Sequence, residues 1–276
     1  MSTDFVVPVL PDWEPTRRTL HLYSRVIGVV PRVHAPSHPK WWQISLRMTD
    51  TGLITCAVPR PEGGFVRLGL DLGAHMLFVD ADDGSRWNFD MAAGLSARAM
   101  AAQVHATVAE LGLPARYPPE KYVDDQPTEY DPGAAQRYFT ALTAMHTIFA
   151  GHRRGLPGEV GPIQLWPHGF DLAFEWFGTK TVEATEDGAT HLYPAQLNLG
   201  FYPGDAQSEA YFYSSPFPFA DTLADAPLPD GATWHTDGWQ GAYLPYATVA
   251  GAADGPARLR DFARRVYTLA RPTLTA

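Results

Sequence analysis

Apolar residues that alternate with polar ones predict strands in the first third of the chain. In residues 19–26, Leu20 and Leu22 fall on one face, whereas His21 and Tyr23 fall on the other. A period of two is typical of a strand that buries one of its faces. We therefore expect an antiparallel strand at residues 19–26, with a histidine and a tyrosine on its polar face.

Short apolar runs separated by turn residues follow this strand and predict an antiparallel meander. Residues 49–52 and 73–74 contain glycine, which tight turns between strands favour. We expect each of the following runs to be a strand: 41–48, 53–58, 65–72, 76–80 and 87–89.

Three other stretches repeat their apolar residues with the 3.6-residue period of an amphipathic helix. The first begins after Ser96, a favourable N-cap, and is expected to end at Gly112. The second begins at residues 131–132, where aspartate precedes a proline at the first helical position, and is expected to close at Gly151. The third follows residues 254–256, which have the sequence Asp-Gly-Pro.

Strand patterns return after the second predicted helix, with many aromatic residues and prolines in residues 166–171, 200–205 and 211–218. Strands, two helices, strands and one helix then follow one another, and this order favours α+β rather than alternating β-α units. We predict a single α+β domain over residues 1–276, in which curved antiparallel sheet is packed by about three helices. The alternative is two loosely similar halves, each a meander followed by a helix.

Composition and charge narrow the possible partners. The formal net charge is -9 and the isoelectric point about 5.5, and an acidic surface repels nucleic acid. The sequence has neither a membrane-length apolar segment nor, in residues 1–5, the basic and apolar regions of a signal peptide. Cys56 is the only cysteine, which excludes an internal disulfide. We therefore expect a soluble cytoplasmic protein that binds a small molecule, with no nucleic-acid or membrane partner.

Three histidines and one aspartate are the candidate catalytic residues. His168 lies in a proline-glycine turn with Asp171 three residues later, and a carboxylate that orients an imidazole sets its tautomer. His21 and His75 lie in predicted strands, and histidine exchanges protons near neutral pH. The alternatives are buried histidines bonded to a neighbouring strand, and an ordinary turn in which Asp171 accepts backbone hydrogen bonds.

Aromatic residues are the candidate substrate-binding groups. Aromatic side chains make up 12% of the chain, and such rings commonly line small-molecule pockets. We expect Tyr23, Trp166, Tyr202 and Tyr213 to line a pocket, with the tyrosine hydroxyls as polar donors. The alternative is that these rings pack the core and nothing more.

The sequence lacks the motifs of covalent, nucleotide-dependent and zinc-dependent catalysis: G-x-S-x-G, G-x-G-x-x-G, G-x-x-x-x-G-K-[ST] and H-E-x-x-H. We therefore expect an enzyme without cofactor or metal, which catalyses a proton-transfer-assisted cyclisation, isomerisation or elimination of a small, largely apolar molecule. Two alternatives remain. One is a non-catalytic small-molecule binding protein, and the other is a metal-dependent oxygenase or hydrolase that uses a histidine cluster.

Seven short segments carry a family resemblance. They read T-L-H-L-Y at 19–23, K-W-W at 40–42, L-D-L-G-A-H-M-L at 70–77, W-P-H-G-F-D-L-A at 166–173, G-F-Y-P-G at 200–204, Y-F-Y-S-S-P-F-P at 211–218 and L-P-Y at 244–246. In this order, over about residues 11–270, they resemble a bacterial family known as domain of unknown function 5996. The resemblance implies a shared fold, and it places His21 and His75 at positions of the family pattern.

The chain departs from that pattern where the pattern has histidine. Lys40 and Gln164 stand at two such positions, and residues 194–196 are Pro-Ala-Gln where the pattern has Ser-His-Glu. Residues 167–169, Pro-His-Gly, replace a small serine loop. If the family histidines serve proton transfer or a metal, this member has lost several and gained His168, which indicates a divergent relative.

Overall fold

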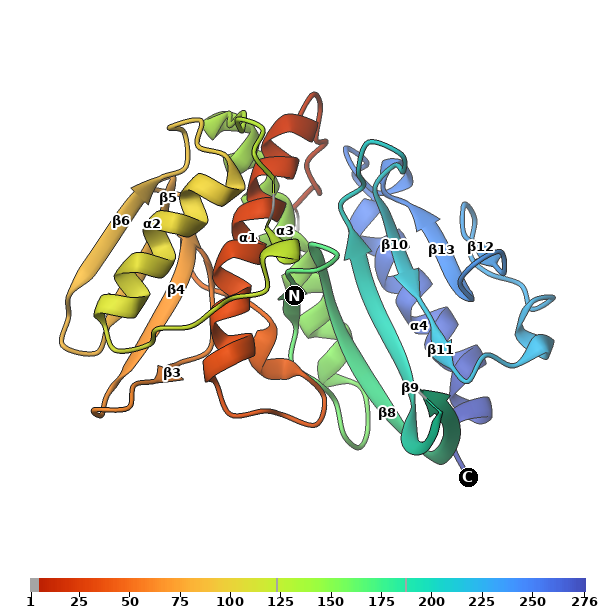
Figure 1. Cartoon of the computed structure of the whole chain (residues 1–276). Helices are drawn as coiled ribbons and strands as arrows, with labels where there is room; N and C mark the ends of the chain where they lie inside the picture. Colours follow the sequence, from red (N-terminus) through yellow and green to blue (C-terminus); the bar gives the residue numbers. More distant parts are fainter. Residues whose placement is uncertain (1–4, 123, 187) are drawn as a thin grey trace. The chain divides into compact units, whose positions relative to one another are not determined.

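The computed structural model describes residues 5–122, 124–186 and 188–276 (Figure 1). Within these residues the chain has four α-helices and two antiparallel sheets, which confirms the predicted α+β class. The chain divides into two compact units: unit 1 comprises the described residues up to Val9 together with Thr140–Ile163 and Leu172–Ala276, and unit 2 comprises Leu10–Phe139 and Gln164–Asp171. A single domain over residues 1–276 stays a prediction.

Unit 2 combines two helices with a six-stranded sheet. The helices are α1 (Glu14–His34) and α2 (Ala97–Glu110), and the short 3-10 helices are η1 (Trp42–Ile44) and η2 (Pro119–Lys121). The strands are β1 (Arg47–Met48), β2 (Gly52–Ile54), β3 (Val58–Pro59), β4 (Phe65–Asp71), β5 (Met76–Ala81) and β6 (Arg86–Asp90). They pair in the order β1-β2-β4-β5-β6, with β3 also beside β4. Helix α1 packs against both α2 and β4.

The hairpins predicted for this unit are present. Strands β4 and β5 pair from Val66 opposite Ala81 to Asp71 opposite Met76, close to the predicted ranges. Strands β1 and β2 form the other predicted hairpin, although the paired segments are shorter than expected because residues 42–44 are helical. Strand β6 pairs with β5 and covers the predicted strand at residues 87–89.

The prediction of a strand at residues 19–26 is wrong, because this segment lies inside helix α1. The fully buried residues of α1 include Leu20, Tyr23, Ile27 and Val30, which are spaced by three and four residues as on one helical face. The short alternation of apolar residues at 19–26 fits this helical spacing as well as the two-residue period of a strand. In a helix Tyr23 points into the core, whereas His21 and Arg25 share another side of the helix.

The three predicted helices are confirmed, and their start signals act as expected. Ser96 Oγ accepts a hydrogen bond from Ala99 N at 3.2 Å at the start of α2. Asp131 Oδ1 accepts one from Ala134 N at 2.9 Å at the start of the helix α3 (Pro132–Arg154). Helix α3 continues three residues past Gly151, where it was expected to close. The last helix is α4 (Gly255–Leu274).

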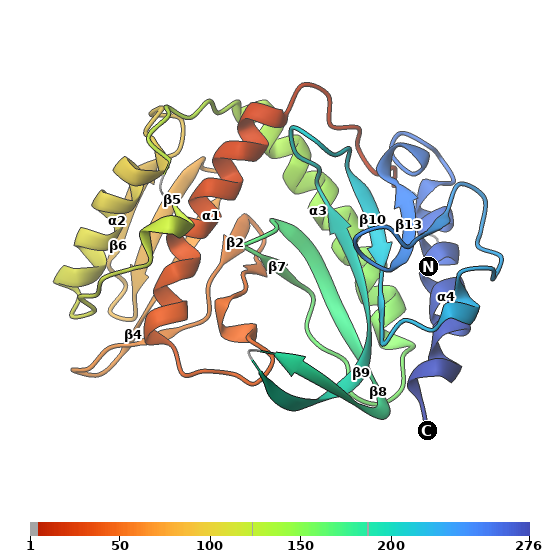
Figure 2. The same ribbon diagram turned by 45° about the vertical axis from the view of Figure 1, so that its right-hand side comes forward.

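Unit 1 is built on a second antiparallel sheet. Its strands are β8 (Asp171–Glu186), β9 (Ala189–Tyr202), β10 (Tyr211–Ser214), β11 (Pro216–Phe217), β12 (Thr233–His235) and β13 (Gly241–Pro245), with two short 3-10 helices, η3 (Asp221–Leu223) and η4 (Tyr246–Thr248). Five of the strands follow the order β12-β13-β10-β9-β8, and β11 pairs with β9. Helix α4 packs along this sheet (Figure 2). Phe201 of β9 lies opposite both Leu172 and Phe212, and all three are buried.

Strand β7 (Gln164–Trp166) belongs to unit 2, where Leu165 forms a β-bridge with Leu46. The turn that follows β7 carries His168. Among the described residues, no helix combines the length and the apolar character needed to cross a bilayer.

Candidate functional site

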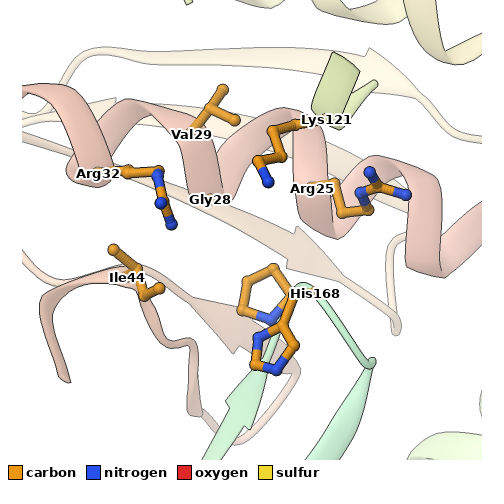
Figure 3. A pocket seen from close by; sticks show the side chains of 8 residues that line it. Arg25, Gly28, Val29, Arg32, Ile44, Lys121 and His168 are labelled. Carbon is orange, nitrogen blue, oxygen red and sulfur yellow. The ribbon is translucent and has the colours of Figure 1, made fainter. Parts of the chain in front are cut away.

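Unit 2 contains a cavity of about 340 Å³ beside His168 (Figure 3). Its walls come from α1, η1, η2 and the turn after β7, and its lining residues are Arg25, Gly28, Val29, Arg32, Ile44, Lys121, Pro167 and His168. A cavity of this size lies at the small end of the range that holds small-molecule ligands.

Helix α1 supplies one wall from a single face. Arg25, Gly28, Val29 and Arg32 follow the spacing i, i+3, i+4, i+7, which places their side chains on one side of the helix. Glycine is required at position 28 by close packing, since a Cβ atom there would lie 2.9 Å from Pro167 Cγ. The missing side chain therefore lets the turn after β7 lie directly against α1.

Three basic side chains meet at the cavity. Arg25 Nη2 donates a hydrogen bond to the carbonyl oxygen of Glu120 at 3.3 Å, and the Arg32 guanidinium lies 5.4 Å from the ring centroid of Trp41. Burial lowers the pKa of Arg25. Within the described part of the chain, no carboxylate forms an ion pair with Arg25, Arg32 or Lys121. The cavity therefore concentrates positive charge in a chain whose net charge is -9.

The turn after β7 presents the His168 ring at the cavity. Phe170 N donates a hydrogen bond to Trp166 O at 2.7 Å and closes the turn. Phe170 takes the left-handed conformation (φ 59°) and is fully buried, with its ring stacked on those of His21 and Tyr138. The His168 ring itself is exposed and meets the Trp166 ring edge-on at a centroid distance of 5.9 Å. The buried Phe170 ring thus fixes the turn, and the His168 imidazole on that turn faces both solvent and the cavity.

The His21 side chain holds the same turn through a hydrogen bond to the backbone of the turn. Its Nδ1 lies 3.5 Å from Arg17 Nη1, and its Nε2 lies 3.1 Å from the carbonyl oxygen of His168. A guanidinium only donates, so Nδ1 accepts and the proton on Nε2 is donated to His168 O. Burial, as the largest cause, lowers the pKa of His21 to about 4. At neutral pH the ring is therefore neutral and suited to position the turn.

The structure places the other predicted catalytic residues at different points of unit 2. The prediction that His75 lies in a strand is wrong, because His75 takes the left-handed conformation (φ 61°) in the turn between β4 and β5. Its Nδ1 is 2.9 Å from the hydroxyl of Tyr130, and it does not line the cavity. Asp171 lies next to the turn, where a Cβ atom on Gly169 would come within 2.6 Å of its Oδ1. Its predicted role as the residue that orients His168 stays a prediction.

The predicted substrate-binding residues are not gathered at this cavity. Tyr23 is fully buried and donates a hydrogen bond to Leu95 O at 2.7 Å, so it acts in the core of unit 2. Trp166 touches the His168 ring without lining the cavity. Tyr202 and Tyr213 belong to unit 1, on β9 and β10. Among the described residues, no Phe, Tyr or Trp lines the cavity, so the cavity does not confirm an aromatic-lined pocket.

The sequence interpretation missed the basic residues of the cavity. Arg25 and Arg32 lie seven positions apart, a spacing that marks one helical face only once residues 14–34 are known to be helical. Lys121 follows a proline-rich stretch without periodicity, and no sequence signal places it near α1. For a metal, no group of three His, Cys, Asp or Glu side chains is suitably placed within residues 5–122, 124–186 and 188–276.

A family model described as "Family of unknown function (DUF5996)" matches residues 7–274. The chain belongs to this family. The predicted resemblance to DUF5996 is therefore confirmed over nearly the whole chain. No curated protein and no solved structure matches it. Because the DUF5996 family carries no assigned function, the geometry of the cavity is the basis for a proposal.

Proposed function

We propose that unit 2 binds a small anionic molecule in the cavity lined by Arg25, Arg32 and Lys121. The observation that supports the proposal is the convergence of three basic side chains, none with a carboxylate partner among the described residues, on one cavity of about 340 Å³. The walls contributed by Val29, Ile44 and Pro167 are apolar and suit a short carbon skeleton.

The energetics of charge clustering favour such a ligand. Like charges that share a partly buried site repel one another, and this repulsion is relieved when an anion binds. Guanidinium groups donate paired hydrogen bonds to carboxylate or phosphate, whereas the lysine ammonium acts as a compact point charge. A positive cavity in an acidic protein also attracts anionic ligands selectively over cations.

The test is thermal unfolding with a panel of small anions, namely phosphate, sulfate, acetate, succinate and citrate, each at the ionic strength of a potassium chloride control. A ligand at roughly 100 times its Kd should stabilise the protein by about 2.7 kcal/mol. The variant Arg32→Gln should weaken binding by about tenfold or more, because one charge-assisted contact is lost.

The matched control is Arg116→Gln, which removes an exposed arginine of unit 2 that does not line the cavity. This variant should bind like the unchanged protein. If no anion stabilises the protein beyond the salt control, or if Arg32→Gln and Arg116→Gln behave alike, the proposal is wrong.

Proton transfer by His168 is the second candidate function, and one observation favours it. His168 is a histidine, the residue type most often used as a general base, and it lies on the same cavity as the three cations. If its imidazole removes a proton from a carbon next to a carboxylate or carbonyl, the electron pair moves onto oxygen. Nearby guanidinium groups would stabilise that developing charge. Isomerisation and elimination both begin with this step.

The test is exchange of C–H protons for deuterium in D2O, followed by NMR for each anion that binds. The variant His168→Gln should slow exchange by about 100-fold or more while binding changes little, because a general base is lost but the cations remain. His191→Gln, at an exposed position of unit 1, is the control. Exchange that persists in His168→Gln would leave the cavity as a binding site without proton transfer.

A further inference from the structure

The two arginines of the cavity lie at its opposite ends. Arg25 and Arg32 are seven residues apart on α1, which separates their Cα atoms by about 10.5 Å along the helix axis. Figure 3 shows them at the two ends of the cavity, with Lys121 between them and His168 on the facing side. Positive charge is therefore spread along a line rather than gathered at one point.

Separate contacts hold the two arginines. The Arg25 guanidinium is tied to the Glu120 carbonyl oxygen in η2, whereas the Arg32 guanidinium lies over the Trp41 ring just before η1. Glu120 and Trp41 lie on different segments, so each arginine has its own anchor at its own end of the cavity. One small monoanion would leave one of these guanidinium groups without a ligand.

The part of the cavity between the arginines is uncharged on the helix side. Gly28 and Val29 form this stretch, Figure 3 shows Ile44 on the facing side, and Pro167 packs against Gly28. Neither Gly28 nor Val29 carries a side chain that is charged or forms hydrogen bonds. The lining between the arginines therefore accommodates an aliphatic segment beside Ile44 and Pro167, while Lys121 and His168 add polar groups on its other sides.

We propose that the ligand of this cavity is a small dianion with an anionic group at each end and a short aliphatic body between them. One anionic group contacts Arg25 and the other contacts Arg32, while the aliphatic body spans the distance between them. Lys121, which lies between the two arginines, adds positive charge that attracts both anionic groups. This inference rests on the proposed function, because it specifies which anions the cavity selects.

A length series of ligands tests the inference. Isothermal titration calorimetry would compare succinate, glutarate, adipate, pimelate and suberate with butyrate, pentanoate, hexanoate, heptanoate and octanoate, the monocarboxylates that match them in carbon number. We expect one dicarboxylate length to bind best, and to bind about tenfold or more tightly than the matched monocarboxylate. The gain comes from the second charge-assisted contact.

Variants at the two ends sharpen the test. Arg25→Gln and Arg32→Gln should each reduce the preference for the best dicarboxylate over its monocarboxylate to about twofold or less, because each removes one end contact. Arg25→Lys and Arg32→Lys keep the charge and should retain most of the preference. Arg116→Gln should leave it unchanged. Circular dichroism without ligand verifies that every variant is folded.

The possible failures are distinct. If no anion binds, the proposed function itself is wrong. If monocarboxylates bind as tightly as dicarboxylates of every length, anion binding stands and the dianion is wrong. If a dicarboxylate is preferred but Arg25→Gln leaves the preference intact, the second anionic group does not contact Arg25 and the assignment of the two ends is wrong.

Discussion

Replacing Phe170 by alanine should lower the free energy of unfolding by about 3–5 kcal/mol. Phe170 is fully buried, and its ring is stacked between those of His21 and Tyr138 at centroid distances of 5.5 Å. Alanine would leave a cavity between these rings and would remove the anchor of the turn that presents His168. Urea denaturation followed by circular dichroism measures the change.

The control for Phe170→Ala is Phe217→Ala, which removes an equally large ring that is 38% exposed. Phe217→Ala should lower the free energy of unfolding by less than Phe170→Ala, because the Phe217 ring is partly in solvent already and its removal leaves no enclosed cavity. Equal losses in the two variants would show that the stacked rings around Phe170 do not anchor the turn. Reduced anion binding by Phe170→Ala at temperatures where it is folded would connect this anchor to the cavity.

Acidification should destabilise both units, chiefly through His21 and His152. Burial, as the largest cause in each case, lowers the pKa of His21 in unit 2 and of His152 in unit 1 from 6.5 to about 4. Between these values the unfolded chain binds a proton that the folded protein does not, so stability falls as the pH drops from 6.5 to 4. Each histidine would account for about 3 kcal/mol, since one pKa unit corresponds to about 1.4 kcal/mol.

Variants assign this pH dependence to particular residues. Denaturant titrations at pH 7 and pH 4.5 should show a smaller difference in stability for His21→Gln and for His152→Leu than for the unchanged protein. His191→Gln removes an exposed histidine and should leave the difference unchanged. A pH dependence that is the same in all three variants would mean that neither buried ring resists protonation in the folded state.

Capping residues and the spacing of apolar residues predicted most of the helices and strands. The main error, a strand at residues 19–26, arose because these residues fit a strand period as well as a helical one. Ser96 and Asp131 act as helix N-caps because their side-chain oxygens accept hydrogen bonds from the backbone three residues later. Residues 19–26 were harder, because eight residues of apolar alternation fit a strand as well as a buried helical face. The proline after Glu14, at the start of α1, was the signal that favoured the helix.

The candidate site was predictable only where one segment determines it. The proline and glycine around His168 predicted an exposed turn, and the imidazole does lie on a cavity wall. Arg25 and Lys121 come from segments about a hundred residues apart, and their proximity depends on how η2 packs against α1. A single sequence holds no local record of such a contact.

Because Gly28 packs closely against Pro167, we expect substitutions at these two positions to depend on one another during evolution. While proline occupies position 167, any larger residue at position 28 would push the two segments apart. Substitution at position 28 is therefore tolerated only alongside a smaller partner, so the two codons are expected to change together. A comparison of DUF5996 sequences can thus reveal this contact, although the two residues are 139 positions apart.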